Sequence, residues 1–574
     1  MEVGHLPMSV AHLTMQTLNT CPQGRTWLIL CLWAWALSPN PVLAQADPAA
    51  AQRNIEQLGQ QLRERSQPKP LVHVDTLGLE ASTPMTRLAS LKVQSAILPQ
   101  AIERYWQPRI GQPVSIEQIQ AFHAWFYDKA AREGFMAYAK TEVVMTPAGE
   151  QLQVQVMQPK INVVRVLSLN GQPDAAHLKR IQARFADKFQ AGVALDTLAL
   201  DQLLDSASFD LPVELEATLR AVGPELLDLV ITVAPAQAQP GHWLSGVAQL
   251  NNHGLRQYGR AQLMAASTVG MPGIKSQLSL LAQASEGIAY GRADVEFLLP
   301  AVGGRGQVFG SYSRSRSVLG GSASTKGQST ELGLGLTRIL GGSRDVVFKG
   351  QMDVVTRQSE SRLQATDAPI SNTKDHQWRW RLSADNERLS NQPVRAEMGL
   401  TLGQYPDAVS LAVPAGSYAR VDLALKSQTH INASGSLRLN ARVRGQWANR
   451  NLDGYNQITL GGVNGVRAYT SADGTGDRGV LGTLELSQSL PFNTTVSVFY
   501  DVGQVVPQVH PLASATVQRY ALQGSGLQVQ GRYFQVQYAL TWARGHRGYK
   551  GWVPSNIESE PNNQRVNLSV SYAF

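Results

Sequence analysis

One arginine in a glycine-rich stretch and one aspartate on a later strand carry the clearest chemical signal in this chain. Arg467 lies in the middle of residues 457–479, whose glycines reach left-handed backbone conformations and permit tight folding. Asp501 belongs to the segment Tyr-Asp-Val-Gly at residues 500–503. A guanidinium and a carboxylate can pair through two parallel hydrogen bonds, which fixes segments in place. The pattern leaves two alternatives open: a positioning ion pair, or a loop arginine and a carboxylate that never meet.

The strand that carries Asp501 has two distinct faces. Val496, Val498, Tyr500 and Val502 share one face, and Asp501 lies on the other face with residues 495, 497, 499 and 503. If this strand spans a membrane, the apolar face must contact lipid, because a charge in hydrocarbon is strongly unfavourable. Asp501 then points into the interior of a barrel, where an inward-folding loop could bring Arg467 to it.

No catalytic, cofactor-binding or metal-binding motif is present. The sequence lacks a Gly-x-Ser-x-Gly, a phosphate loop and a His-Glu-x-x-His, and its 11 histidines are scattered. Both cysteines, Cys21 and Cys31, lie within the first 44 residues, which leaves no thiolate site or disulfide in the remainder. His123 lies on an apolar helix face and is expected to be a core or boundary histidine. We therefore expect no enzyme, no cofactor and no metal.

The composition favours a membrane β-barrel. Charged residues make up only 16% of the 574 residues, and there are 50 glycines. Beyond residue 44, no apolar run reaches the roughly 18 residues of a membrane helix, so a membrane protein of this kind must be a barrel. The net charge of +8 is not organised into a basic stripe with interleaved aromatics, so nucleic-acid binding is not expected.

The N-terminal segments resemble a secretion signal followed by a polar helix. Residues 1–44 contain an apolar block at 27–37 and a small-residue ending at Ala44, which is typical of a signal peptide cleaved after Ala44 or Ala46. Residues 47–66 form a predicted helix with few apolar positions, and residues 67–84 form a proline-containing linker. Such a helix is either solvated or inserted into another part of the protein.

Two units of similar order follow at residues 85–160 and 161–236. Each reads as strand, helix, helix, strand, strand, and Ser115 is the expected cap of the second helix in the first unit. In such a small α+β domain, two helices cover one face of the sheet.

Residues 241–574 show about 16 runs of alternating apolar and polar residues, which predicts an antiparallel transmembrane barrel of about 16 strands. The last run places apolar residues at every second position and ends with Tyr572 and Phe574. The inner face of the predicted barrel is strongly charged. The arginines on this face would line a wet channel, pair with carboxylates such as Asp385 and Glu485, or do both. The expected lumen arginines are Arg379, Arg381, Arg438, Arg442 and Arg444. Two basic clusters, at 313–317 and 544–550, are predicted to lie in loops.

These features together resemble the outer-membrane polypeptide transporter superfamily. In that family, a barrel loop with a Val-Arg-Gly-Tyr tip folds into the lumen, and its arginine meets the acidic residue of an Asp-x-Gly strand motif. The matching residues are Val466, Arg467, Ala468 and Tyr469 for the tip, with Ala468 in place of glycine, and Asp501 and Gly503 for the strand. Phe574, with Tyr572 before it, resembles the C-terminal barrel signal of this class. Two POTRA-like units point to the two-partner secretion transporters of the haemolysin secretion/activation type.

The resemblance implies a function in protein export. It implies a bacterial outer-membrane pore with periplasmic N-terminal domains, which recognises an unfolded secreted partner and passes it to the cell surface. It further implies that residues 47–66 act as a plug in the lumen, that outer-membrane lipids surround the barrel, and that the barrel-assembly machinery inserts it. The alternatives are a barrel-assembly or surface-export factor of the same superfamily, or a solute porin or adhesin.

Overall fold

The structure is a computed structural model that describes residues 73–74 and 84–574, except for 134, 169–174, 212, 224, 236–243, 272–275, 321–323, 343–345, 387–392, 411–412, 433–434, 512–518, 547–559 and 561. The predicted signal peptide (1–44), the N-terminal helix (47–66) and most of the linker (67–84) lie outside the described residues. None of the helices in the described part of the chain is long and apolar enough to cross a membrane.

Residues 85–157 fold into a small α+β unit. Its elements are β2 (Leu88–Gln94), α3 (Pro99–Trp106), the 3₁₀ turn η1 (Gln107–Arg109), α4 (Ile116–Arg132), β3 (Tyr138–Thr146) and β4 (Gly149–Met157). The sheet order is β2-β4-β3, and the buried rings of Trp106, Phe122 and Phe126 pack between helices and sheet. Ser115 caps α4 as predicted: its hydroxyl accepts from the Gln118 amide at 3.3 Å, and the Gln118 side chain accepts from the Ser115 amide at 3.1 Å.

Residues 160–235 form a second unit of the same kind. Its elements are β5 (Lys160–Ser168), α5 (Ala175–Lys188), α6 (Thr197–Asp210), β6 (Val213–Gly223) and β7 (Leu226–Pro235). The sheet order is β1-β6-β7-β5, in which β1 (His73–Val74) pairs parallel with the edge of β6. The predicted order of helices and strands is therefore present in both units, whereas β1, from the predicted linker, was not expected to join a sheet.

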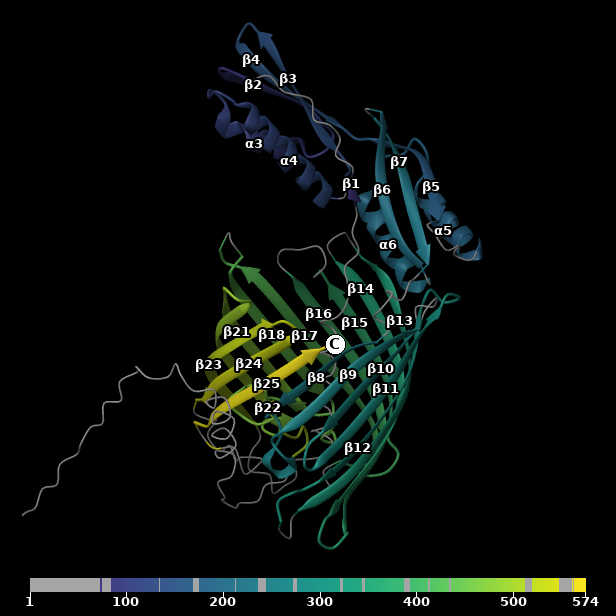
Figure 1. Cartoon of the computed structure of the whole chain (residues 1–574), viewed down its shortest axis with the longest axis vertical. Helices are drawn as coiled ribbons and strands as arrows, with labels where there is room; N and C mark the ends of the chain where they lie inside the picture. Colours follow the sequence, from purple (N-terminus) through teal and green to yellow (C-terminus); the bar gives the residue numbers. More distant parts are fainter. Residues whose placement is uncertain are drawn as a thin grey trace, which may run out of the picture. The chain divides into compact units, whose positions relative to one another are not determined.

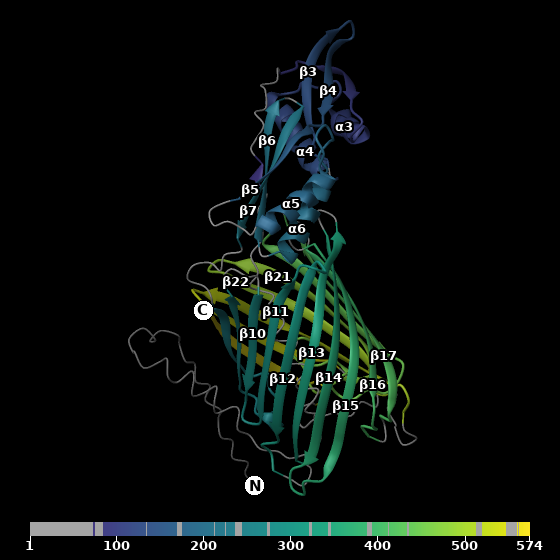
Figure 2. The same ribbon diagram turned by 90° about the vertical axis from the view of Figure 1, so that its right-hand side faces the viewer.

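Sixteen antiparallel strands close into one barrel, which confirms the predicted fold class. The strands are β8 (Leu244–Asn251), β9 (Gln262–Met271), β10 (Ser276–Ala284), β11 (Ile288–Leu299), β12 (Gly304–Arg316), β13 (Thr325–Gly342), β14 (Val347–Leu363), β15 (Pro369–Asp385), β16 (Val394–Tyr405), β17 (Gly416–His430), β18 (Leu437–Ala448), β21 (Arg478–Leu490), β22 (Thr494–Val506), β23 (Tyr520–Tyr533), β24 (Val536–Gly545) and β25 (Gln564–Ala573). The barrel closes where β25 pairs with β8 (Figure 1). Figure 2 shows the wall from the side of β10–β17. The 3₁₀ turn η2 (Arg256–Tyr258) lies between β8 and β9.

Side chains alternate between a lipid-facing and a lumen-facing surface. Val498, Tyr500 and Val502 on β22 are exposed outward, whereas Asp501 on the same strand is fully buried inside. The outward apolar residues include Trp378 and Trp380 on β15. The predicted faces are therefore confirmed, and Asp501 points into the lumen.

The two ends of the barrel differ in the length of their connections. At one end the connections are short and comprise residues 272–275, 300–303, 343–346, 386–393, 431–436, 491–493 and 534–535. The connections at the opposite end, which we call the long-loop end, comprise residues 252–261, 285–287, 317–324, 364–368, 406–415, 449–477, 507–519 and 546–563. Outer-membrane barrels carry short periplasmic turns and longer extracellular loops, so the resemblance described above implies that the long-loop end is the extracellular one.

The prediction that residues 313–317 form a loop was wrong, because β12 continues to Arg316. The loop prediction for 544–550 was also wrong at its start, since Arg544 and Gly545 belong to β24. Both segments alternate small or polar residues with arginines, a pattern that resembles a loop but equally fits the end of a strand that leaves the membrane.

His123 supplies a test of the first unit. It is buried, its Nε2 lies 3.0 Å from the Thr141 hydroxyl, and burial lowers the pKa of His123 below its usual 6.5. The unfolded state therefore takes up a proton more readily, so stability is retained above pH 6.5 and falls as the pH decreases below it. The test measures hydrogen exchange of residues 116–146 in the full chain, corrected for intrinsic rates. Amide protection of these residues should decrease when the pH is lowered from 7 to 5, and this decrease should be smaller in His123→Gln than in the native sequence. His177→Gln is the control. An equal decline in His123→Gln and the native protein would contradict the assignment.

Candidate functional site

The longest connection between consecutive barrel strands, residues 449–477 between β18 and β21, folds into the lumen. It contains a two-stranded ribbon of β19 (Ile458–Thr459) and β20 (Thr475–Gly476). Leu460, Val466, Ala468 and Tyr469 in this loop are completely buried. They form one apolar cluster with lumen-facing residues of four strands, which are Leu481, Phe499, Val505, Leu522 and Ala543. This is the sixth connection at the long-loop end, and we call it the inward loop.

Two glycines show why the inward loop needs residues without a side chain. Gly474 has a φ of 70°, in the left-handed region that other residues rarely adopt. At Gly465, an added Cβ would lie 1.9 Å from the carbonyl oxygen of Leu460, which is far inside van der Waals contact. The glycine-rich composition therefore serves the tight folding of the loop, as the sequence indicated.

Arg467 at the tip of the inward loop binds Asp501 of β22 through two parallel hydrogen bonds. Its Nε lies 2.9 Å from Asp501 Oδ2 and its Nη2 lies 3.0 Å from Oδ1. The backbone amide of Arg467 donates to the same carboxylate at 3.1 Å, and the Thr483 hydroxyl donates to it at 2.9 Å. This carboxylate therefore fixes both the side chain and the backbone of the tip.

Further contacts complete the surroundings of the guanidinium. Its Nη1 donates to Glu485 of β21 at 2.7 Å and to Gln528 of β23 at 3.1 Å. The guanidinium carbon lies 3.3 Å from the centre of the Phe499 ring, a cation–π contact. Arg467 and Asp501 are 4% and 0% exposed, so water screens their attraction little. Losing one member of such a buried pair strands the other charge and typically costs about 3–5 kcal/mol.

The remaining tip and strand residues of the motif pack the loop against the wall. The Tyr469 hydroxyl donates to the carbonyl of His546 at 2.9 Å. Ala468 has no left-handed φ, so its methyl group in place of glycine introduces no backbone strain. The inward loop fits because neighbouring strands carry glycine where it approaches: an added Cβ at Gly503 would lie 2.9 Å from Leu460, and one at Gly524 would lie 3.1 Å from Ala468.

A second contact region, which sequence reasoning missed, holds the first part of the inward loop. Asp453 forms an ion pair with Arg357 of β14 and accepts from the Tyr405 hydroxyl of β16 at 2.9 Å. The Tyr455 hydroxyl donates to Glu331 of β13 at 3.1 Å. These partners lie on strands different from those that bind the tip.

Asn456 completes this region by using both ends of its amide. Its nitrogen donates to Asp375 of β15 at 2.8 Å, and its oxygen accepts from Gln377 at 3.1 Å and from Arg420 of β17 at 2.9 Å. Arg357 also lies 3.4 Å from Asp375, and both side chains are fully buried. The segment Asn-Leu-Asp-Gly-Tyr-Asn at 451–456 is visibly polar in the sequence, but its partners are too far away along the chain to be identified from it.

The predicted lumen arginines do face inward, and the structure gives most of them partners. Arg379 pairs with Glu331 at 3.1 Å, Arg381 donates to Gln351 at 3.3 Å, and Arg438 donates to Ser489 at 3.1 Å. Arg444 donates to the carbonyl of Asn464 in the inward loop at 3.0 Å. These arginines therefore contact neighbouring groups of the wall and the loop, whereas their role in lining a wet channel stays a prediction.

The arrangement positions a loop within the lumen. Among the described residues, no cluster of His, Cys, Asp or Glu could hold a metal ion. The contacts link one inward loop to two parts of the barrel wall, at β13–β17 through Asp453, Tyr455 and Asn456, and at β21–β24 through Arg467 and its neighbours.

The second contact region predicts a local effect of Asp453→Ala. This change leaves the buried Arg357 guanidinium with Asp375 as its remaining carboxylate, so the first part of the inward loop should detach. We expect hydrogen exchange of residues 449–457 in the full chain to accelerate about 100-fold or more, because breaking a buried ion pair costs about 3 kcal/mol or more and each ~1.4 kcal/mol corresponds to a tenfold change. Exchange of residues 466–470 should change little.

Arg438→Ala is the matched control, because Arg438 also faces the lumen but contacts Ser489 rather than the inward loop. Unchanged exchange at 449–457 in Asp453→Ala, or equal acceleration in Arg438→Ala, would show that this contact does not hold the loop.

Comparison with known proteins places this site in a family. The profile of the haemolysin secretion/activation protein family ShlB/FhaC/HecB matches residues 232–530, which is more than half of the chain. None of the curated proteins compared with the chain matches it.

Two solved structures share the fold. CdiB from Escherichia coli is 18% identical, with a TM-score of 0.57, and the similarity covers 93% of this chain and 100% of that one. CdiB from Acinetobacter baumannii is 16% identical, with a TM-score of 0.58 and the same coverage of 93% and 100%. A closed barrel whose sixth loop is pinned inside it, together with a profile match over most of that barrel, leads to one conclusion: the chain belongs to the haemolysin secretion/activation protein family.

Proposed function

We propose that the inward loop keeps this pore in its transport-competent arrangement, with the Arg467–Asp501 pair as its main anchor. Members of the family are outer-membrane secretion pores for a partner protein, and this chain is one of them. The contact that carries the proposal is the two-bond pairing of Arg467 with Asp501, at 2.9 and 3.0 Å, inside a polar lumen.

The two N-terminal units at 85–160 and 161–236 are proposed to act as POTRA domains that receive the unfolded partner on the periplasmic side. The first sheet has the order β2-β4-β3 and so ends in the edge strand β3, on which Met145 is 74% exposed. An extended chain can add to such an edge through main-chain hydrogen bonds, which suits recognition of an unfolded protein.

The lumen chemistry supports passage of an extended polypeptide. Polar and charged side chains line the wall, including Arg379 and Arg381, and they can exchange hydrogen bonds with peptide groups as the chain moves. Transport of this kind needs no catalysis, and we propose that the chain has no enzymatic activity and no cofactor. Folding of the partner outside the cell would bias the direction of movement.

Further assignments concern biogenesis and the N-terminal segments. We propose that residues 1–44 are a signal peptide and that residues 47–66 act as a plug, connected by the linker at 67–84. Phe574 pairs with Gly246 of β8 through two backbone hydrogen bonds of 2.9 and 3.0 Å, and its ring faces outward with that of Tyr572. This exposed aromatic end is proposed to be the signal that the barrel-assembly machinery reads, and outer-membrane lipids surround the finished barrel.

Replacing Arg467 tests the proposed anchor. In cells that produce the secreted partner, we expect Arg467→Ala to reduce export at least about tenfold, while the barrel still migrates as a folded, heat-modifiable species. Arg467→Lys should restore export only in part, because lysine keeps the charge but cannot form the two parallel bonds.

Arg438→Ala is expected to export normally. Normal export by a fully assembled Arg467→Ala barrel would remove the proposal that this pair is needed. Loss of many unrelated outer-membrane barrels when the chain is deleted would instead indicate an assembly factor, and high conductance without any partner binding to residues 85–236 would indicate a porin.

A further inference from the structure

The outward face of β12 carries two arginines that the export function does not use. Along this strand, Val308, Tyr312, Arg314 and Arg316 all face outward and are exposed. Successive outward residues of a strand lie about 7 Å apart, so the two guanidiniums stand one and two steps beyond Tyr312 toward the long-loop end. Among the described residues, neither Arg314 nor Arg316 has a carboxylate within ion-pair distance.

The level of Tyr312 marks the upper edge of the apolar band in this part of the wall. Below it, Leu332 and Leu334 on β13 are exposed apolar residues. Thr330 of β13 lies at the level of Tyr312, and the outward residues of β13 above it are Gln328 and Lys326. Tyrosine is enriched at the membrane–water interface, where lipid headgroups begin. Arg314 and Arg316 therefore stand at headgroup height on the extracellular side.

Neighbouring strands extend the basic surface in register. Arg316 lies opposite Lys326 of β13, and Lys326 lies opposite Arg362 of β14. Lys326 and Arg362 share Asp367, at 2.5 and 3.3 Å, and Arg362 also pairs with Glu360. Like charges placed directly opposite each other are destabilising, and these two carboxylates compensate only part of the row. Lys326 and Arg362 are thus balanced by Asp367 and Glu360, and the surplus positive charge of two is that of Arg314 and Arg316 themselves.

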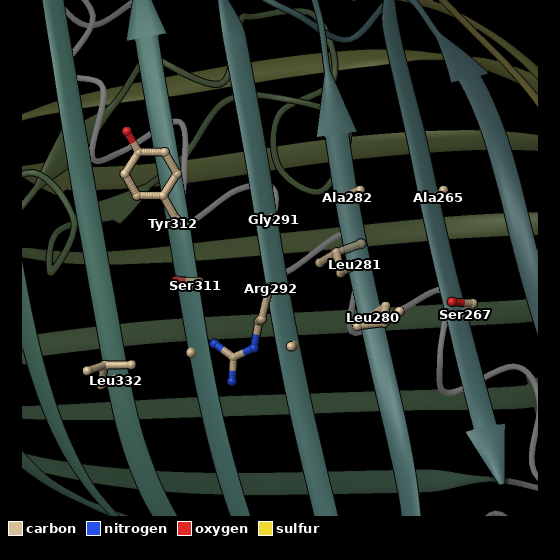
Figure 3. A pocket seen from close by; sticks show the side chains of 12 residues that line it. Ala265, Ser267, Leu280, Leu281, Ala282, Gly291, Arg292, Ser311, Tyr312 and Leu332 are labelled. Carbon is tan, nitrogen blue, oxygen red and sulfur yellow. The ribbon is translucent and has the colours of Figure 1, made fainter.

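Directly below the arginines, the wall is hollowed. An open hollow of about 660 Å³ lies over β9–β13 (Figure 3). The cross-strand row immediately below Arg314 reads Ala265, Ala282, Gly291 and Tyr312, and the next row reads Ser267, Leu280, Ala293, Gly310 and Leu332. Small residues on the outward face thus leave a depression, bounded by the larger side chains of Leu280, Tyr312 and Leu332.

We propose that this surface is a binding site for a phosphorylated, multi-acyl glycolipid of the outer leaflet, the chemistry of lipopolysaccharide. Arg314 and Arg316, supported by Lys326 and Arg362, bind its phosphates through charge-assisted hydrogen bonds. The hollow over β9–β13 receives an acyl chain of this lipid. A lipid tail that passed over the hollow without entering it would lose van der Waals contacts with the residues that line it. The arginines that bind phosphate lie above the apolar hollow that receives the acyl chain. This is the order in which the headgroup and the acyl chains of a lipid lie in the leaflet.

The first test measures binding of the phosphorylated glycolipid to the purified full chain in detergent by native mass spectrometry. Each basic residue near an anionic lipid surface contributes roughly one kcal/mol, so we expect the double variant Arg314→Gln, Arg316→Gln to bind about 30-fold more weakly. Arg544→Gln is the matched control. Arg544 is also exposed at the long-loop end of its strand, but β24 lies six strands away from β12 around the barrel.

The source of the phosphate and the role of the hollow are tested separately. A dephosphorylated glycolipid should bind the native chain and the double variant equally weakly, and millimolar inorganic phosphate should not displace the lipid. Gly291→Leu places a side chain in the hollow, at a position where an added Cβ meets no atom within 4 Å. It should weaken binding while leaving the heat-modifiable barrel intact.

Three results would overturn the site: unchanged binding in the double arginine variant, equal loss in Arg544→Gln, or full competition by inorganic phosphate, which would indicate a free-anion site. Unchanged binding in Gly291→Leu would remove the acyl-chain part. None of these outcomes depends on partner export.

Discussion

The hydrocarbon core of a membrane offers no hydrogen-bond partner to a peptide group, and this constraint governs the C-terminal part of the chain. Sixteen strands satisfy it by closing on themselves, with β25 paired to β8 so that no edge remains. Closure then divides the side chains into an apolar outer set and a polar inner set. Buried charges such as Asp501 are tolerated only because the inner set exists and supplies them with partners.

The two contact regions of the inward loop follow the same chemical logic with opposite polarity. At the tip, the loop supplies the cation Arg467, and the wall supplies Asp501 and Glu485. In the first part of the loop, the loop supplies the anion Asp453, and the wall supplies the cation Arg357, which also meets Asp375. The reversed polarity means that each region of the wall is matched by charge to its own part of the loop.

Much of this could be predicted because the relevant signals are local. Alternation along β22 assigns Asp501 to the lumen, and Ser115 marks the start of α4, since both patterns depend only on nearby residues. The partners of Asp453 and Asn456 could not be predicted, because they lie on strands that only barrel closure brings close. The end of β12 was missed for a different reason: Arg314 and Arg316 are charged yet face outward, where the strand has already left the apolar band and the usual rule of polar residues inside no longer applies.

The inward loop also has a mechanical consequence. It joins two separate arcs of the wall, β13–β17 and β21–β24, and so acts as a tie across part of the cross-section. A cylinder of strands without such a tie can flatten under the lateral pressure of the bilayer, because strands slide and bend more readily than they separate. With the tie in place, these two arcs of the wall are held at a fixed distance from each other by contacts that do not depend on the strand ladder.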